Sequence, residues 1–425
     1  MISRRYNNIP GTSMASIAGW SRTQRDVVAA AFLGWTLDAF DYFLVVFVLN
    51  GLAKDFGAAD RDVSEALFWT LAMRPVGALL FGRMADHFGR RPALMTSVVL
   101  YSVTELATAG VHSLSWFLVL RALFGVGMGG VWGVGASLAF ESVPVSSRGF
   151  VSGLLQVGYP SGYLLASIVY GVLFDRIGWR GMFVLGAAPA LLVFFIRSRV
   201  PESSVWEKTR AMPAARNLWT ALAGHWGLAL YAILLMACFN FFSHGTQDLY
   251  PKFLQKQREF DTGTVSLIAI VYNIGAICGG LTFGSLSSRM GRRRTIALAA
   301  GLSLLILPFW AYAITPMMLA AAAFVMQFLV QGAWGVVPAH LNELAPAAVR
   351  ATFPGVVYQL GNLIASRNSV LQTAIAEHHG SVQHPDYSFA LTWVAGLIAV
   401  VLTVMALCGP ERRDIRFDGE ASAEQ

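Results

Sequence analysis

Charged side chains are scarce in this sequence. Asp, Glu, Lys and Arg make up 13% of its 425 residues, about half the share usual for a soluble domain, whereas hydrophobic residues make up 56%. This composition excludes a disordered chain and a coiled coil, and a soluble fold of this length could not bury so much apolar surface. A membrane-spanning helix needs about 20 apolar residues, so the hydrophobic total suffices for roughly twelve. We therefore expect a polytopic membrane protein.

Cysteines are few, and a cleavable leader is not evident. The three cysteines, Cys238, Cys278 and Cys408, lie in apolar runs, and their odd number gives no reason to expect disulfides or a zinc site. Residues 1–25 are polar and include four arginines, but they contain no short apolar core followed by small residues. The first apolar run therefore predicts a retained helix.

Apolar runs of about 20 residues recur along the chain. They cover residues 27–51, 63–83, 93–111, 115–140, 149–173, 179–198, 226–250, 264–285, 293–313, 316–341, 351–374 and 387–408. We predict an all-α membrane protein of 12 transmembrane helices, with six-helix bundles at 1–200 and 226–410, a cytoplasmic linker at 201–225 and a cytoplasmic tail at 411–425.

The positions of the basic residues indicate how these helices are oriented. With the N-terminus inside, the inner segments hold 21 of the 31 Lys and Arg residues, the outer loops hold 7, and 3 lie within predicted spans. Because cytoplasmic loops are enriched in Lys and Arg, we expect both termini in the cytoplasm. The same clustering explains the net charge of +7 better than nucleic-acid binding does, so no nucleic-acid partner is expected.

The two halves of the chain repeat each other at an offset of 202 residues. The stretch 81–91 (FGRMADHFGRR) recurs at 283–293 as FGSLSSRMGRR. The same offset relates Trp132, Gly133, Glu141, Pro144 and Arg148 to Trp334, Gly335, Glu343, Pro346 and Arg350. Since each copy holds six spans, the copies are parallel, and a substrate is expected near the midplane between them.

Ionisable residues inside the predicted spans are costly in lipid and suggest functional positions. Asp38 and Asp41 share one face of the first span, with Asp38 about 16 Å deep, where a carboxyl group is suited to taking up and releasing a proton. Arg74 lies about 12 Å along the second span, where it could hold an anionic substrate or neutralise one of the two aspartates. We expect Glu105 and Arg121 to form a structural or coupling pair.

A polar stripe follows one face of the seventh span. Asn240, His244 and Asp248 are four residues apart, and Ser243 and Gln247 follow the same spacing beside them. Because five polar groups cannot face lipid, this stripe is expected to face the central cavity or a neighbouring helix.

The loop after the second span resembles the signature loop of the major facilitator superfamily. The motif is Gly82-x3-Asp86-x2-Gly89-Arg90-Arg91. Arg121 with the glycines at 125, 127 and 129 is similar to a fourth-helix motif of the same superfamily. The resemblance implies twelve helices that work by alternating access. We expect the loop to act as a conformational gate in which the aspartate pairs across the seam between the halves in the outward-open state. The second copy has a serine at the matching position 288, so the two gates should differ.

The stretch 240–248 resembles a motif of the Jen-type lactate permeases, which belong to the sialate–proton symporter family. All defined positions of Asn-x-x-Ser/Thr-His-x-Ser/Thr-Gln-Asp are present, while a lysine replaces the final Thr of the longer motif. Gln359 and Asn362, which share a face of the eleventh span, resemble a Gln-x-x-Asn pair of the same permeases, although hydrogen bonding between helices would also explain them. The resemblance implies uptake of lactate, pyruvate and similar acids with protons, and ties His244 and Asp248 to the proton and Asn240 to substrate.

We therefore expect a proton symporter for short monocarboxylates in the plasma (inner) membrane. The candidate substrate ligands are Arg74, Asn240, His244, Gln359 and Asn362, and the candidate proton-coupling residues are Asp38, Asp41, His244 and Asp248. The expected partners are the bilayer, a small carboxylate anion and a proton, with no cofactor or metal and the chain as a monomer. Alternatives are a carrier of sialic acid or another organic anion, a drug–proton antiporter and a carboxylate sensor. An enzyme is not expected, because the sequence lacks a nucleophile–base constellation, a metal set and a phosphate loop.

Overall fold

The computed structural model describes residues 19–210, 224–413 and 415–417, and the ordered elements within them are helices. The predicted linker and tail fall partly on residues 211–223, 414 and 418–425, which lie outside the described residues, as do residues 1–18. The first half contains α1 (Arg22–Phe56), α2 (Asp60–Phe88), α3 (Arg90–Ala109), α4 (Leu114–Ser142), α5 (Arg148–Leu185) and α6 (Ala190–Arg199), followed by the short α7 (Ser204–Thr209).

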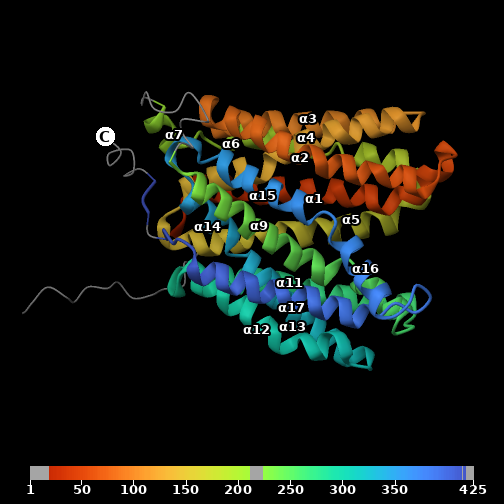
Figure 1. The fold of residues 1–425 in the computed structure, drawn as a ribbon. Helices are drawn as coiled ribbons and strands as arrows, with labels where there is room; N and C mark the ends of the chain where they lie inside the picture. Colours follow the sequence, from red (N-terminus) through yellow and green to blue (C-terminus); the bar gives the residue numbers. More distant parts are fainter. Residues whose placement is uncertain (1–18, 211–223, 414, 418–425) are drawn as a thin grey trace, which may run out of the picture.

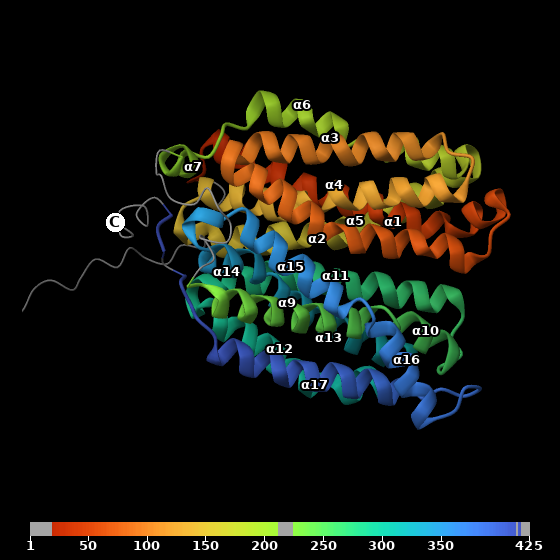
Figure 2. The ribbon, with the colours of Figure 1, turned by 45° about the horizontal axis from the view of Figure 1, so that its top comes forward.

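The second half is built in the same way from more segments. It contains α9 (Trp226–Gln247), α10 (Tyr250–Lys256), α11 (Thr262–Met290), α12 (Arg292–Tyr312), α13 (Pro316–Trp334), α14 (Val337–Leu344), α15 (Thr352–Ala365), α16 (Asn368–His379) and α17 (Tyr387–Cys408). The helices α1 to α6 lie together on one side of the molecule, and α9 to α17 lie on the other (Figures 1 and 2). The two groups touch mainly where α2 packs on α15 and α5 packs on α11.

Each predicted span corresponds to one helix or to two consecutive helices, but three spans predicted as continuous are interrupted. The span 179–198 is split between the end of α5 and α6, 316–341 between α13 and α14, and 351–374 between α15 and α16. Pro189 precedes α6 and Pro338 lies in the first turn of α14, where proline is tolerated because it has no N–H to donate. Within α5, the backbone leaves the helical region at Gly178 (φ 62°, ψ −175°).

Eight helical segments of the described chain are long and apolar enough to cross a membrane, and one of them, Val145–Arg199, covers two predicted spans. The helices α2 and α3 fall outside this set, and α15 and α16 are each shorter than a crossing because the helix breaks between them. These are also the helices that carry much of the gate and of the candidate site.

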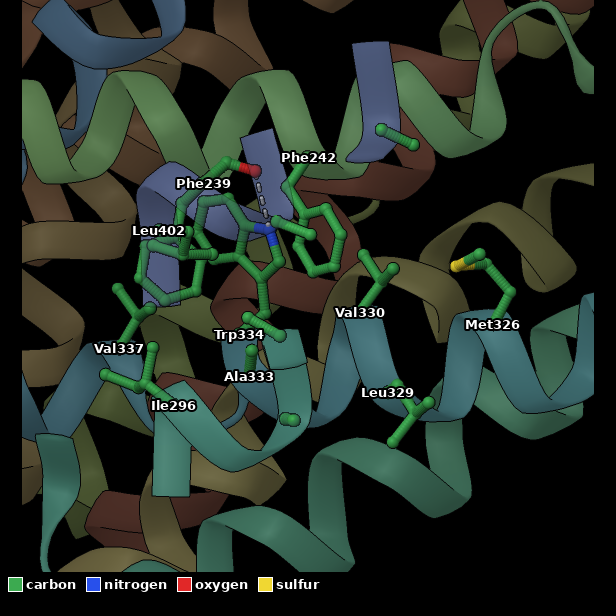
Figure 3. Packing of buried hydrophobic residues seen from close by; sticks show 14 of the residues in the cluster. Phe239, Phe242, Ile296, Met326, Leu329, Val330, Ala333, Trp334, Val337 and Leu402 are labelled. Carbon is green, nitrogen blue, oxygen red and sulfur yellow. Dashed lines mark hydrogen bonds between the residues drawn. The ribbon is translucent and has the colours of Figure 1, made fainter. Parts of the chain in front are cut away.

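The core of the second half packs around an indole. The Trp334 ring of α13 lies 5.3 Å from the Phe239 ring of α9, and its Nε1–H donates to the Phe239 carbonyl at 3.2 Å (Figure 3). Val330, Val337 and Ile296 from α13, α14 and α12 surround the pair, and all are buried. This packing fixes α9, which carries the polar stripe, against α13.

Both ends of the described chain meet at one end of the molecule, called the terminal end below. Trp20, which precedes α1, donates to the hydroxyl of Ser147 at 3.1 Å. Arg148, the first residue of α5, donates to the carbonyl of Ile415 at 2.8 Å, just after α17. The loop between α2 and α3 lies at this end as well.

Candidate functional site

Arg74 of α2 is buried (2% exposed) beside two side chains of α1. Its Nη2 lies 4.0 Å from a carboxylate oxygen of Asp38, and its guanidinium carbon lies 5.9 Å from the centre of the Trp35 ring. At 4.0 Å the two charges attract each other without a hydrogen bond. In the described part of the chain, neither the Nε and Nη2 of Arg74 nor the two Asp38 oxygens have a hydrogen-bond partner. Arg74 therefore keeps donors for another carboxylate.

Asp41 lies one turn further along α1 and faces other groups. A Cβ added at Gly186, between α5 and α6, would lie 3.2 Å from Asp41 Oδ1 and 2.7 Å from Glu105 Cγ, so both acids approach the same point. Glu105 is paired with the guanidinium of Arg121, and all three side chains are fully buried. Asp41 thus faces the Glu105–Arg121 pair, whereas its neighbour on the same helix face approaches Arg74.

One face of the polar stripe on α9 contacts α15 and α16. Nδ1 of His244 lies 3.2 Å from Oδ1 of Asp248, and Nε2 lies 3.3 Å from the amide oxygen of Asn362 on α15. Ser369 of α16 donates to the other Asp248 oxygen at 3.1 Å. The side chains of His244 and Asp248 are 32% and 39% exposed. This face therefore offers a His–Asp pair that solvent can reach.

The other face of the stripe packs on α13. Gln247 donates to the amide oxygen of Gln327 at 2.8 Å, and Gln331 donates to the hydroxyl of Ser243 at 3.2 Å. Gln327 and Gln331 are not among the residues predicted for the site, although two glutamines four residues apart in an apolar span are a usable signal. The amide of Asn240 donates at 2.8 Å to a carbonyl one turn earlier in its own helix.

Aromatic side chains from both halves meet between these polar groups. The ring of Tyr358 on α15 lies 4.7 Å from Trp132 and 5.7 Å from Trp334, the two tryptophans related by the 202-residue repeat. Trp35 lies 6.4 Å from Tyr358 and 5.7 Å from Tyr159 of α5. In the sequence, the two tryptophans stand out as repeat positions and not as site residues. Their shared contact shows that the repeat axis passes near this aromatic cluster.

Arg74 is connected to the second half through an aromatic ring. Its guanidinium carbon lies 5.9 Å from the centre of the Trp35 ring, which lies 6.4 Å from the ring of Tyr358 on α15. Gln359 of α15 is 1% exposed, and within the described residues neither atom of its amide has a hydrogen-bond partner. A buried cation and aromatic rings thus gather between α1, α2 and α15, and α15 also carries the unpartnered amide of Gln359. Such a set can bind a small anion with an apolar or flat body.

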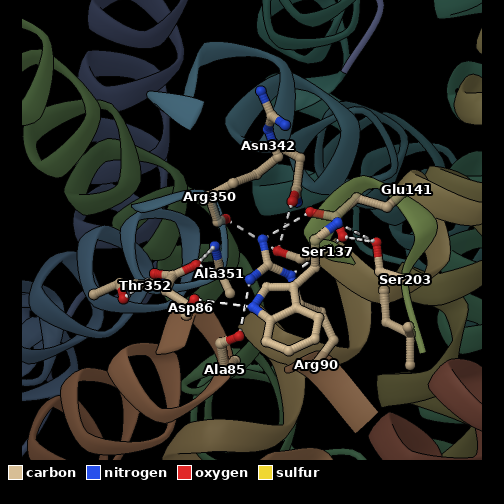
Figure 4. Close-up of polar contacts among 12 residues, drawn as sticks. Ala85, Asp86, Arg90, Ser137, Glu141, Ser203, Asn342, Arg350, Ala351 and Thr352 are labelled. Atoms are coloured by element: carbon tan, nitrogen blue, oxygen red, sulfur yellow. Dashed lines mark hydrogen bonds and ion pairs between the residues drawn. The ribbon is translucent and has the colours of Figure 1, made fainter. Parts of the chain in front are cut away.

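At the terminal end, Asp86 of α2 binds the start of α15 (Figure 4). One carboxylate oxygen accepts from the backbone N–H of Ala351 at 3.0 Å. The other accepts from the N–H of Thr352 at 3.2 Å and from its hydroxyl at 2.6 Å. A carboxylate is favoured here because the first amides of a helix have no partner within the helix and carry partial positive charge. Asp86 therefore joins the two halves.

An arginine–glutamate pair supports this contact, and the second half repeats it. Arg90 donates to both oxygens of Glu141 on α4 at 2.9 and 3.2 Å and to Asp86 at 3.1 Å (Figure 4). In the second half, Arg292 donates to both oxygens of Glu343 at 2.8 and 2.9 Å. The position that matches Asp86 holds Ser288, whose buried Oγ has no hydrogen-bond partner among the described residues. The two seams are therefore held differently.

Two glycines of the gate motif allow close contacts. A Cβ at Gly82 would lie 2.6 Å from the Cα of Thr352, so α2 and α15 could not approach as they do. Gly89 has a φ of 111°, and a Cβ there would lie 2.2 Å from an oxygen of Glu202. Glu202 accepts from the backbone N–H groups of Arg90 and Arg91 at 2.9 and 3.1 Å. Burial raises the pKa of the Glu202 carboxyl. The Arg91 guanidinium donates to a carbonyl at the end of α6.

Comparison with known proteins identifies the family. A model of the Major Facilitator Superfamily matches residues 31–366 and 233–423. The chain is 29% identical over 419 residues to the carboxylic acid transporter protein homolog of Saccharomyces cerevisiae, which covers 90% of this chain and 67% of that protein. It is 27% identical over 363 residues to the sialic acid transporter NanX of Escherichia coli, with 84% and 88% covered.

A solved structure shows the same fold. The proton:xylose symporter XylE, bound to 6-bromo-6-deoxy-D-glucose, matches with a TM-score of 0.72 at 19% identity, over 95% of this chain and 99% of that one. The helices described above are therefore those of a multi-pass membrane protein with twelve transmembrane helices in two parallel repeats, and the protein is a transporter and not an enzyme. The chain belongs to the Major Facilitator Superfamily.

Proposed function

We propose that this protein is a secondary transporter that takes up small organic acids together with protons. The observation that supports this most strongly is Arg74, a buried cation of α2 whose Nε and Nη2 have no hydrogen-bond partner in the described part of the chain. A carboxylate leaves water for a low-dielectric site only if a fixed charge and hydrogen-bond partners replace its hydration. The yeast and Escherichia coli relatives, named for carboxylic acids and sialic acid, support an organic acid as the substrate.

Within this class we favour short monocarboxylates such as lactate or pyruvate, and membership of the sialate–proton symporter family. The motif at 240–248 supports this narrower proposal. The rings of Trp35, Trp132 and Tyr358 also support it, because they offer few hydrogen-bond partners beside Arg74 and suit an acid with a short apolar body.

A second candidate substrate is sialic acid or another hydroxylated organic anion. The observation that favours it is the amide and hydroxyl network between α9 and α13, in which Ser243, Gln247, Gln327 and Gln331 could exchange partners with sugar hydroxyls. The Escherichia coli relative points the same way.

Proton coupling follows from competition for one cation. Symport requires that the substrate-bound transporter changes conformation only when a proton is also bound. Protonation of Asp38 would remove its attraction for Arg74 and leave the guanidinium to the substrate, so that proton and acid favour each other's binding. Asp41 beside Glu105 and the pair of His244 and Asp248 are the other candidate proton carriers.

The gate completes the cycle. We place both termini in the cytoplasm of a cell whose inner membrane holds the protein, so the terminal end faces inward. In this state Asp86 closes that end by binding α15, and it must release Ala351 and Thr352 before the inside can open. We expect the protein to work as a monomer, since one chain supplies both halves of the site.

Uptake by purified protein in liposomes tests the proposal. With the interior more alkaline than the outside, we expect labelled lactate to accumulate above its external concentration, and a protonophore should abolish the accumulation. Excess pyruvate should compete and excess sialic acid should not. Accumulation of sialic acid in place of lactate would overturn the narrower proposal and leave the organic-acid class standing. If no organic acid exchanges across the membrane at all, the class itself is wrong.

A further inference from the structure

An arginine-rich cleft lies at the terminal end, and none of the residues that line it belongs to the substrate site or to the contact of Asp86 with α15. It lies between the start of α12 and the end of α17 and has a volume of about 730 Å³. One acid, Glu411, lines it together with four arginines, which are Arg293, Arg294, Arg412 and Arg413. The lining side chains therefore carry a formal charge of +3, from four cations and one anion.

Backbone carbonyls hold two of the four arginines of the cleft. Arg293 donates to the carbonyl of Ala406 at 2.9 Å, and Arg413 donates to the carbonyl of Arg289 at 3.1 Å. Glu411 accepts from the backbone N–H at the start of α12, so its charge is already used to cap that helix. An anion that enters the cleft therefore meets two guanidinium groups with defined positions, with the exposed Arg294 and Arg412 beside them.

An apolar surface leads away from the same cleft. Its lining includes Met290 and Leu407, which are 36% and 49% exposed. The helices α12 and α17 pack side by side, and each continues with exposed aliphatic residues three or four positions apart: Leu298, Leu302 and Leu305 on α12, and Val400, Val404 and Leu407 on α17. These residues face lipid, because both helices cross the membrane. The cleft thus joins a lipid-facing apolar surface to a cluster of cations.

We propose that this cleft binds the headgroup of an anionic phospholipid, with its acyl chains along α12 and α17. Arginine matches the geometry of a phosphate by paired hydrogen bonds, and basic pockets at the ends of transmembrane helices suit anionic headgroups. A free phosphate would use the same arginines but would gain nothing from the aliphatic residues, which is why the lipid is the better occupant. The bound headgroup would lie beside Glu411, which caps the helix that begins with Arg292 of the second gate pair.

Native mass spectrometry of the full chain with defined lipids tests the proposal. We expect dioleoyl-phosphatidylglycerol to bind at least tenfold more tightly than dioleoyl-phosphatidylcholine. The double variant Arg294→Gln with Arg412→Gln removes two exposed charges and should weaken phosphatidylglycerol binding about 25-fold, roughly fivefold for each charge. The matched control, Arg197→Gln with Arg199→Gln, removes two exposed charges from the end of α6 and should change the affinity less than twofold.

The outcomes separate lipid binding from other sources of affinity. Equal binding of the two lipids, or an equal loss in the control variant, would overturn the proposal, because the effect would then come from diffuse charge. Displacement of phosphatidylglycerol by millimolar inorganic phosphate would also overturn it and identify a free-anion site. Thermal unfolding without lipid shows whether the double variant is folded. If it is not, the single variant Arg294→Gln should show the fivefold loss, and an unchanged affinity would contradict the proposal.

Discussion

At the scale of single residues, the site depends on one cation that is buried but incompletely paired. Arg74 approaches Asp38 at 4.0 Å and the Trp35 ring at 5.9 Å, and neither contact uses its fork of donors. Attraction between opposite charges is several times stronger in a protein interior than in water, so a carboxylate that reaches this fork gains more than it would at an exposed arginine. Under the proposed function, the aspartate and a substrate acid would compete for the same group.

Replacing Arg74 by lysine tests this competition. Arg74→Lys keeps the charge and loses the planar fork, so the KM for labelled lactate in counterflow should rise about tenfold or more, which corresponds to about 1.4 kcal/mol. The control is Arg180→Lys, which alters an exposed pair with Asp55 whose side chains are 39% and 43% exposed, and it should leave KM unchanged. A wild-type KM in Arg74→Lys would remove this residue from the site.

The two aspartates of α1 should give different phenotypes. Asp38→Asn and Asp41→Asn should each retain exchange of lactate and lose accumulation driven by a pH gradient, because an amide cannot carry the proton. Asp38→Asn should also change the affinity for lactate, since it no longer attracts Arg74, whereas Asp41 faces the Glu105–Arg121 pair. Counterflow and gradient-driven uptake measured on the same liposomes distinguish these effects. Normal accumulation in both variants would shift the proton to His244 and Asp248.

Residue spacing indicates which side chains share a helix face but does not indicate what that face meets. The four-residue step from Asn240 to Asp248 predicts the stripe on α9, because helical periodicity is local. The stripe divides between α13 and α15, and this depends on how three helices pack. For the same reason, the contact of Gln331 with Ser243 had to come from the structure.

At the scale of elements, the halves are joined through helix starts and glycines. The first turn of α15 receives Asp86, and the glycine at 82 lets α2 come within contact of its backbone. The sequence predicts the helices but not the breaks that interrupt three of the predicted spans. Proline at 189 and 338 begins new helices inside runs that hydropathy alone reads as continuous. The separation of α15 from α16 has no such local signal in the sequence.

Removing the charge of the cap should slow the cycle. Asp86→Asn keeps one acceptor oxygen in place of two, so the hydrogen bonds from either Ala351 or Thr352 are lost, and those that remain are no longer charge-assisted. We expect the initial uptake rate per molecule in the membrane to fall several-fold at unchanged abundance. The matched control is Ser288→Ala at the repeat-related position, whose rate should stay within twofold. Unchanged uptake in Asp86→Asn would show that this contact is not part of the gate.

Adding one methyl group between α2 and α15 should open the terminal end. A Cβ at Gly82 meets the Thr352 backbone at 2.6 Å, so Gly82→Ala forces the helices apart. In a background without native cysteines, Ala351→Cys should then react faster with a water-soluble maleimide. Gly171→Ala of α5, where a Cβ would have nothing within 4 Å, provides the control and should not change the rate. Equal labelling in both variants would mean that the seam tolerates the methyl group.

At the scale of the whole molecule, two similar halves enclose the proposed site. The contacts between the halves differ at repeat-related positions. The pairs Arg90–Glu141 and Arg292–Glu343 repeat at the same offset, whereas the charged cap occurs at Asp86 and not at Ser288. This inequality suits a carrier in which one seam must release for each cycle. The fold was predictable because hydropathy and the 202-residue repeat extend along the whole chain. The sequence does not predict that the terminal end is closed, because both states of an alternating carrier have the same sequence.

In the proposed transport cycle, both halves hold one small carboxylate at once. The most direct measurement is a cryo-electron microscopy structure of the protein with the acid that the uptake experiments identify. We predict density for a carboxylate within about 3 Å of the Arg74 guanidinium, with the body of the acid against Tyr358 and in contact with His244 or Asn362. Density bound to one half alone, or lying away from Arg74, would contradict the account.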